Sequence, residues 1–305
     1  MIDITYSATR AFLDCPQKYD WRYRQCLAPK EIPVALTFGG LIHASLELWH
    51  KGNAEQALAI IDIETDLAPQ DKAKAMGIMR AYIDRYPTEP FEVKALEMEF
   101  KQPIINPATK HSSRTYTMRG KVDGIVYMDG EYYLLEHKTT SSIDEAYLMR
   151  LSEDRQIILY QIYMERQLGK TFAGVIYNIL EKPRIRQKQK ETDEEFAERC
   201  YEESSKPEAM HREIMRFNAY KKRMAEDHHW HLLKVMMLME NGSMPYYQND
   251  GNCTQWGRPC PYLPLCQFKT SHVPNSQSKQ ELLRLQEALY DKRIPHAELQ
   301  EVTDD

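Results

Sequence analysis

Apolar residues recur at helical spacing along most of the chain, and turn-forming residues divide this pattern into segments. The pattern predicts helices over residues 4–24, 38–50, 54–67, 70–86, 147–168, 193–203, 207–240 and 278–291. Shorter runs rich in β-branched and aromatic residues predict strands over residues 91–100, 115–127, 131–138 and 172–180. A few strands among many helices indicate an α/β (α+β) protein with a central mixed sheet flanked by helices.

The dipeptide Asp129-Gly130 separates two of these strands and predicts a tight hairpin. Counting outward from this turn places Asp123 opposite Glu136. Side chains alternate along a strand, so Lys138 is expected on the same face as Glu136. The same register places Lys121 opposite Lys138, which favours a divergence of the strands at that point.

Two opposed carboxylates destabilise a sheet unless something neutralises them, and a divalent cation would do so. Oxygen ligands favour Mg²⁺ or Mn²⁺. A neighbouring lysine could then orient the attacking water and stabilise charge on a phosphate. The alternative is a solvated hairpin face with an ordinary Glu–Lys pair, and register alone leaves both interpretations open.

Composition limits the other possibilities. The chain has 305 residues and the content of apolar and charged residues usual for a soluble globular protein. Its first residues lack the basic and apolar regions of a signal peptide, and no run of about 18 apolar residues occurs, so a cytoplasmic protein is expected. The net charge of −5 neither supports nor excludes DNA as a partner, because charge acts locally.

Cysteines form a second candidate site. Cys253, Cys260 and Cys266 lie in a segment rich in glycine and proline that is expected to be irregular. In a reducing cytosol such spacing favours metal binding over disulfides, and a tetrahedral site needs a fourth ligand. Cys26 and Cys200 have no partner by spacing and are expected to pack as ordinary residues.

The strings GKVDG at 120–124 and LLEHKT at 134–139 resemble motifs II and III of the PD-(D/E)XK nucleases, which have a restriction-endonuclease-like fold. They are most similar to the RecB-like branch, which includes the CRISPR-associated RecB-like exonucleases and the AddB nuclease domain. The resemblance implies that Asp123 and Glu136 bind catalytic metal ions, that Lys138 is essential for hydrolysis, and that the carbonyl of His137 is a further ligand.

The string FGGLIHASLE at 38–47 resembles motif I of this branch, in which a helix presents a histidine to the metal. His43 would supply that ligand, with Gly39 and Gly40 permitting the helix to start. Glu47 could orient His43 or lie in solvent. Without the hairpin motifs, a structural role for a single helical histidine would be favoured.

The string QIILY at 156–160 resembles the Q-x-x-x-Y motif of the family. Gln156 and Tyr160 share one helix face, where the resemblance implies that they help to position DNA or the active-site groups. Otherwise they are routine positions on a half-buried helix. Glu99 is a further candidate acid on the strand before the hairpin.

The cysteine pattern extends the resemblance. RecB-like exonucleases with a 4Fe–4S cluster use one cysteine near the N-terminus and three beyond the nuclease core, which implies that Cys15 joins Cys253, Cys260 and Cys266. The spacing departs from the family, because six residues separate the first two of the three. Structural Zn²⁺ is the main alternative. Either group would join the N- and C-terminal segments.

Basic residues could contact phosphates, and the many tyrosines could stack on unpaired bases, although each charge run alone favours a solvated face. One group is expected in an irregular loop and the other on a long helix: Lys182, Arg184, Arg186, Lys188 and Lys190; and Arg212, Arg216, Lys221, Lys222 and Arg223.

The sequence therefore predicts a metal-dependent DNA nuclease without a helicase motif, acting in recombination, repair or DNA processing in a bacterium or a bacteriophage. An exonuclease that prefers single strands or free ends is favoured. A structure-specific endonuclease and a non-catalytic DNA-binding module are the alternatives. The predicted organisation is one nuclease domain over 1–270, with a helical part over 1–88, a catalytic core over 89–182 and a helical, cysteine-containing part over 193–270, followed by a helix and polar tail over 271–305.

Overall fold

The computed structural model describes residues 1–255, 257–294, 296 and 299, and the chain forms two compact units. The first unit draws its residues from Met1–Ile32, Lys101–Gly120 and Arg223–Asp305, and the second from Pro33–Phe100 and Lys121–Lys222. The units interleave along the chain. The expected single domain over 1–270 stays a prediction, and the acidic tail at 301–305 lies outside the described residues.

A mixed sheet of six strands organises the fold. Its strands are β1 (Ile2–Ile4), β3 (Glu92–Ile105), β4 (Ser112–Met128), β5 (Glu131–Thr140), β6 (Phe172–Glu181) and β7 (Met210–Met215). They lie in the order β1-β4-β5-β6-β7, and β3 pairs with β4. The pairs β1–β4 and β5–β6 are parallel, whereas β4–β5 and β6–β7 are antiparallel. The predicted mixed sheet is confirmed.

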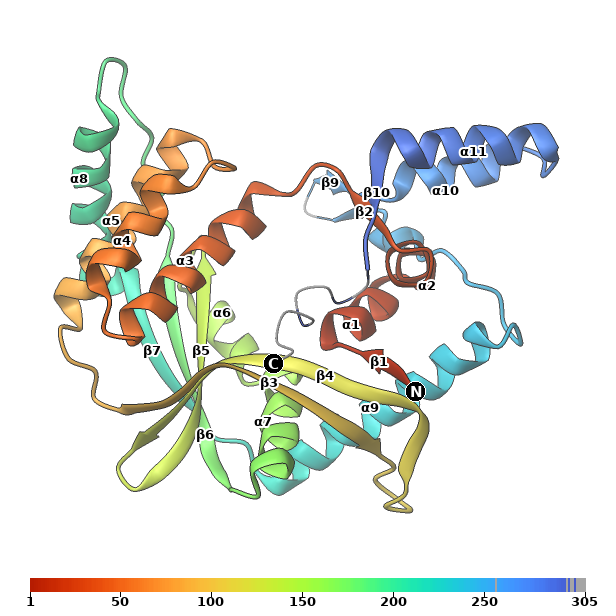
Figure 1. Ribbon diagram of the computed structural model, residues 1–305, viewed down its shortest axis with the longest axis horizontal. Coiled ribbons are helices and arrows are strands. Elements are labelled where there is room, and N and C mark those ends of the chain that lie inside the picture. The colour runs from red at the N-terminus through yellow and green to blue at the C-terminus, as the bar shows by residue number, and fades with distance from the viewer. Residues whose placement is uncertain (256, 295, 297–298, 300–305) are drawn as a thin grey trace, which may run out of the picture. The chain divides into compact units, whose positions relative to one another are not determined.

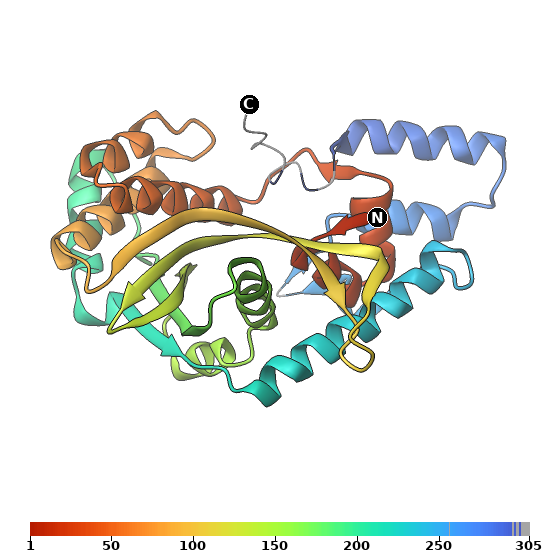
Figure 2. The same ribbon diagram turned by 60° about the horizontal axis from the view of Figure 1, so that its bottom comes forward.

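Helices cover the strands of the second unit. They are α3 (Val34–His50), α4 (Ala54–Ile63), α5 (Pro69–Arg85), α6 (Glu145–Leu151), α7 (Arg155–Leu168) and α8 (Asp193–Ser204). Figures 1 and 2 show α3, α4, α5 and α8 gathered on one side of the strands and α6 and α7 on the other. This confirms the α/β class with helices flanking a central sheet.

The first unit contains most of the long helix α9 (Ala219–Glu240) and a number of shorter elements. They are α1 (Tyr6–Asp14), α2 (Pro16–Tyr19), the π-helical turn Asp20–Arg24, β2 (Leu27–Pro29), β8 (Thr254–Gln255), β9 (Arg258–Pro259), α10 (Leu263–Ser271), α11 (Ser276–Leu289) and β10 (Tyr290–Lys292). No helix among the described residues is long and apolar enough to cross a membrane.

The core of the second unit forms where α3 and α5 pack together. Phe38, Ile42, Ile78 and Tyr82 are almost fully buried there and belong to one apolar cluster. Burying a side chain of this size contributes about 1.5–3 kcal/mol. Where α5 meets α8, a Cβ atom on Gly77 would lie 2.6 Å from the Cβ of Cys200. Cys200 is thus a buried packing residue.

The hairpin between β4 and β5 forms as its sequence predicts. Asp129 and Gly130 both have positive φ, at 51° and 84°, which matches the two-residue turn that favours Asp-Gly. The predicted register holds from Met128↔Glu131 to Gly124↔Leu135. The described ladder stops there, one pair before Asp123 and Glu136.

The helix expected over 4–24 is wrong in its middle. Thr5 caps α1, as expected, with its side chain accepting a hydrogen bond from the Ala8 amide. The chain is then extended at Cys15, where φ is −166° and ψ is 116°. Cys15 precedes Pro16, whose ring disfavours helical backbone at the preceding residue. This break separates α1 from α2.

The helix expected over 207–240 is wrong in its first part, where β7 pairs with β6 at the edge of the sheet. The helix α9 starts only after Asn218, whose side chain accepts a hydrogen bond from the Lys221 amide. Over so few residues, spacing alone does not separate a helix from a strand, and pairing with β6 decides the structure.

The helix expected over 147–168 is two helices, α6 and α7. Asp144 caps α6 by accepting from the Tyr147 amide, and Asp154 caps α7 by accepting from the Gln156 amide. Aspartate is among the residues that favour helix starts, so Asp154 begins a new helix where a continuous one was expected. Gly169, with φ of 61°, ends α7.

Candidate active site

Strand β5 holds Glu136 and Lys138 on the face that α7 covers. The Lys138 Nζ donates to the Glu136 Oε1 at 2.6 Å and lies 3.8 Å from the Asp154 Oδ2 at the start of α7. The side chain of Glu136 is 8% exposed and that of Lys138 26%. The structure therefore brings this acid and this lysine together as the alternation predicts, in a partly enclosed place.

Asp123 joins this group from β4, although it does not pair directly with Glu136. Its Oδ2 accepts from the His137 backbone amide at 2.7 Å and lies 3.4 Å from the His43 Nδ1 on α3. The carboxylate thus bridges β5 and α3, at the point where the described ladder between β4 and β5 has ended.

The two carboxylates titrate in opposite directions. Burial, together with the charge of Asp123, raises the pKa of Glu136. Burial also opposes ionisation of Asp123, but the hydrogen bond and charge of His43 lower its pKa below the usual value. Asp123 therefore ionises more readily than an ordinary aspartate and Glu136 less readily than an ordinary glutamate, as expected of two acids that share a site.

His43 and Lys138 respond to the same charges. Burial disfavours the imidazolium of His43, but the hydrogen bond and charge of Asp123 raise its pKa above the usual value. Burial likewise disfavours the ammonium of Lys138, and the charges of Glu136 and Asp154 raise its pKa. Lys138 is therefore a permanent cation beside the carboxylates.

The helix around His43 differs from expectation. It begins at Val34, so Gly39 and Gly40 lie inside α3 and do not form its start. At Gly39 a Cβ atom would lie 3.5 Å from the Thr139 Oγ1, which places this part of α3 close to the end of β5. Glu47, one turn after His43, accepts a hydrogen bond from the Lys51 side chain at 2.6 Å.

The imidazole of His137 faces away from Glu136, as strand alternation requires. It stacks on His50, with ring centroids 5.3 Å apart, and its Nδ1 lies 3.0 Å from the Asn178 Nδ2. Burial lowers its pKa well below the usual value, so the ring is neutral. The backbone amide of His137 donates to Asp123, and its ring also contacts the edge of His43, with the centroids 5.8 Å apart.

Gln156 and Tyr160 lie on α7 beside the carboxylates. Burial and then the charge of Glu136 raise the pKa of Tyr160, whose side chain is hydrogen-bonded to Gln156. Tyr160 therefore keeps its proton and is available as a hydrogen-bond donor. The structure brings these two residues to the same group as Glu136 and Lys138.

Two acids near the site were missed from the sequence. Asp154 has the recognisable pattern of a helix cap, but its contact with Lys138 depends on the fold.

Glu97, the second missed acid, lies on β3 and binds the Lys121 Nζ at 2.5 Å, so the Lys121 side chain points to the neighbouring strand. Glu97 has φ of 50°, which is uncommon for a residue other than glycine and is not visible in the sequence. The backbone carbonyl of Glu99, the acid singled out instead, accepts from Gln167.

The expected basic helix is also revised. Arg212 lies on β7 with its guanidinium 2.7 Å from Glu89 and stacked over Tyr86 at 3.7 Å. Lys221 binds Glu153 at 2.6 Å, and Lys222 binds Glu165 at 2.7 Å. Arg216 likewise pairs with Glu131. Most of these charges are balanced within the protein.

In the first unit, four cysteines gather around one small cavity: Cys15, Cys253, Cys260 and Cys266. The Asn249 amide donates to the Cys15 Sγ at 3.3 Å, and the Cys260 amide donates to the Cys253 carbonyl at 2.7 Å. Burial raises the pKa of Cys260 and of Cys266. The helix break at Cys15 and the irregular segment that holds Cys253 and Cys260 bring three of the four expected sulfur donors to one place. The fourth, Cys266, lies on α10, where an irregular segment was expected.

Neither site is a preformed metal centre. Among the residues that the structure describes, no three His, Cys, Asp or Glu side chains form a group ready to hold a metal ion. The side chains at each site nevertheless have the chemistry to bind a metal ion or a cluster. Asp123 and Glu136 offer carboxylate oxygens in a partly enclosed place, which suits Mg²⁺ or Mn²⁺, and four thiols suit an iron–sulfur cluster or zinc.

Comparison with known proteins agrees with this geometry. The model of the PD-(D/E)XK nuclease superfamily matches residues 3–267, most of the chain. This chain belongs to the PD-(D/E)XK nuclease superfamily. It is therefore a nuclease, and members of this superfamily typically use Mg²⁺ or Mn²⁺.

Solved structures give more distant matches. A crystal structure named "Putative exonuclease" from Eubacterium rectale is 12% identical and covers 89% of each chain, with a TM-score of 0.46. A crystal structure of SSO0001 is 13% identical, covers 79% of this chain and 77% of that chain, and has a TM-score of 0.35. No curated protein matches this nuclease.

Proposed function

We propose that this nuclease hydrolyses DNA from free ends, with a preference for single strands, at the group formed by Asp123, Glu136 and Lys138. One observation supports this most strongly. Residues from two strands place two carboxylates and a permanently charged lysine in one partly enclosed cluster, and one of the carboxyl groups has a raised pKa. Such perturbed groups concentrate at functional sites.

Asp123 and Glu136 would hold the catalytic metal, with His43 and the His137 carbonyl as the further ligands that the family resemblance implies. A bound Mg²⁺ or Mn²⁺ supplies Lewis-acid polarisation of the scissile phosphate. Lys138 lies within hydrogen-bond distance of Glu136 and can orient a water and stabilise negative charge on the phosphate. Tyr160 and Gln156 would position the DNA or the catalytic groups from α7.

Within the superfamily, we place the chain in the RecB-like branch with a cysteine-bound cofactor. Cys15, Cys253, Cys260 and Cys266 would hold a 4Fe–4S cluster, which would fasten the N-terminal and C-terminal segments of the first unit to each other. The setting we propose is recombination, repair or DNA processing.

The choice of substrate can be tested with purified protein and DNA of defined topology. Linear single-stranded DNA is expected to be degraded in Mg²⁺ or Mn²⁺, linear duplex more slowly, and neither in EDTA. Closed circles of either kind are expected to stay intact, because they offer no end.

Each other outcome identifies a competing function. Cutting of closed circles would show an endonuclease. Binding without cleavage in any divalent metal would show a DNA-binding module that has lost its activity.

A further inference from the structure

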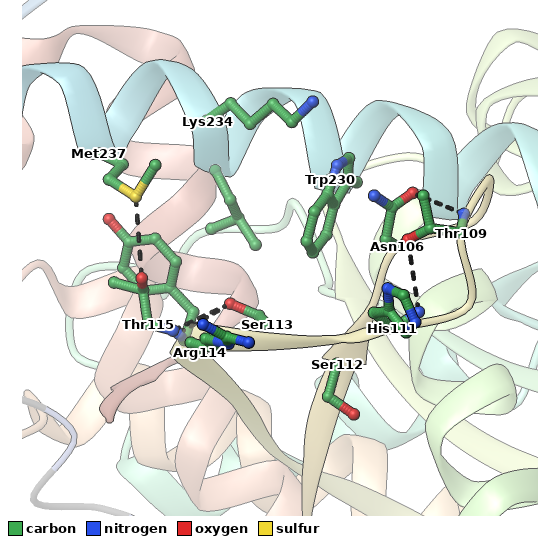
Figure 3. Close-up of a pocket in the computed structure, with 12 residues that line it drawn as sticks. Asn106, Thr109, His111, Ser112, Ser113, Arg114, Thr115, Trp230, Lys234 and Met237 are labelled. Carbon is green, nitrogen blue, oxygen red and sulfur yellow. Dashed lines mark hydrogen bonds between the residues drawn. The ribbon is translucent and has the colours of Figure 1, made fainter.

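A groove in the first unit is lined by none of the residues assigned to the active site. Its volume is about 550 Å³, within the range of pockets that take small organic ligands. One wall is α9 and the other is the hairpin at the end of β3 and β4 (Figure 3). Its lining includes Arg114, Tyr116, Trp230, Lys234 and Met237.

The hairpin wall is held by its own hydrogen bonds. The side-chain oxygen of Asn106 accepts hydrogen bonds from the backbone amides of Ala108 and Thr109. The backbone amide of Asn106 donates to the His111 carbonyl at 2.8 Å. The Ser113 hydroxyl accepts from the Tyr116 amide at 3.0 Å. Such local bonds fix the loop in one conformation.

Glu240, near the end of α9, joins this helix to two other segments of the first unit. The hydroxyl groups of Tyr19 and Tyr116 each donate to this carboxylate at 2.7 Å. Burial and Glu240 raise the pKa of both tyrosines, so both stay protonated and remain donors. The groove is therefore built before any ligand arrives, which lowers the entropic cost of binding.

The lining is aromatic, apolar and cationic. Figure 3 shows the Trp230 indole extending from α9 toward the hairpin, with Lys234 and Met237 on the same helix and Arg114 on the opposite wall. The Lys234 Nζ lies 5.9 Å from the centre of the indole ring. No carboxylate is found among the residues lining the groove.

The two cations differ from the basic residues that follow β6. Arg212, Arg216, Lys221 and Lys222 are all held in ion pairs. Arg114 and Lys234 are exposed, and neither forms an ion pair within the described part of the chain. Their charge is available to an anionic ligand.

We propose that this groove binds an unpaired segment of a DNA strand, with a base packed against Trp230 and the adjoining phosphates held by Arg114 and Lys234. An aromatic wall beside free cations is the usual arrangement of proteins that bind single strands without reading their sequence. The proposal rests on the proposed function, because it takes the substrate of the nuclease as the occupant of the groove.

Equilibrium binding in EDTA, where no cleavage occurs, tests the proposal. The probe is a fluorescein-labelled oligothymidylate followed by anisotropy. Trp230→Ala is expected to weaken binding by about tenfold, the loss of one stacked base, and Trp230→Phe to retain most of the affinity. The double variant Arg114→Gln, Lys234→Gln is expected to show a weaker salt dependence. The slope of the logarithm of the binding constant against the logarithm of the salt concentration should be smaller in magnitude by about 1.4, the value for two phosphate contacts on a single strand.

Lys279→Gln is the matched control, because Lys279 is exposed on α11 of the same unit and does not line the groove. It is expected to bind like the wild type, and thermal unfolding establishes that each variant is folded. Folded variants of Trp230, Arg114 and Lys234 that bind like Lys279→Gln would overturn the proposal, and the groove would then serve another ligand, such as a protein. Absence of DNA cleavage by the wild type would instead refute the proposed function.

Discussion

Replacing Lys138 by alanine is expected to reduce the rate of DNA hydrolysis by about 10²–10³-fold or more, the usual loss when a group that stabilises transition-state charge is removed. Its ammonium is the only cationic side chain that the structure places within hydrogen-bond distance of Glu136 among the described residues. The initial rate on linear single-stranded DNA in Mg²⁺ measures the effect. Folding should survive, because burial and Asp123 raise the pKa of Glu136, which can take up a proton when the lysine is gone.

Lys94→Ala is the control for this variant. Lys94 lies on β3 of the same sheet and pairs with Glu92 at 2.6 Å, outside the cluster. It should cleave DNA at the wild-type rate. If Lys138→Ala were as active as Lys94→Ala, Lys138 would have no part in hydrolysis and the assignment of the site would be wrong.

The second large effect is expected from Cys266→Ser. The Cys266 thiol is buried beside the three other cysteines, so its loss should prevent binding of the proposed cofactor and destabilise the first unit. Loss of a metal or cluster is among the few changes that cost on the order of 4 kcal/mol of unfolding free energy. Iron and acid-labile sulfide per chain, measured on protein purified without oxygen, and the midpoint of urea unfolding give the two readouts.

Cys26→Ser provides the comparison, because Cys26 belongs to the same unit but does not line the cavity. It should keep both the iron and the stability of the wild type. Zinc without iron in the wild type would replace the cluster by a structural zinc site. Equal stability of the two variants, with no metal in either, would exclude a cofactor at the cysteines.

The sequence predicted what depends on local rules. The turn at Asp129-Gly130 needs only residues that tolerate positive φ, and it set the register of β4 and β5 correctly. Alternation along β5 then placed Glu136 and Lys138 on one face. The place of Asp123 opposite Glu136 was an extrapolation past the end of the described ladder, and the contact with the His137 amide replaces it.

Features that depend on non-local pairing were not predicted. Spacing favoured a helix around Arg212, yet β7 joins a strand that lies about thirty residues earlier in the chain, and the half-buried Arg212 pairs with Glu89. The contact between Lys121 and Glu97 depends on the pairing of β3 with β4. The break at Cys15, by contrast, depends on a local rule. Proline disfavours helical backbone at the residue before it, so Pro16 predicts the break, although the helical spacing of the apolar residues suggested a continuous helix.

Mg²⁺-dependent cleavage of linear DNA by Asp123→Asn tests whether the cluster of Asp123, Glu136 and Lys138 is the site of hydrolysis. This change keeps the size of the side chain and removes the charge that faces His43 and the His137 amide. The proposed site predicts a folded protein that no longer releases nucleotides from end-labelled DNA at any Mg²⁺ concentration that supports the wild type. Cleavage by Asp123→Asn at the wild-type rate would contradict it.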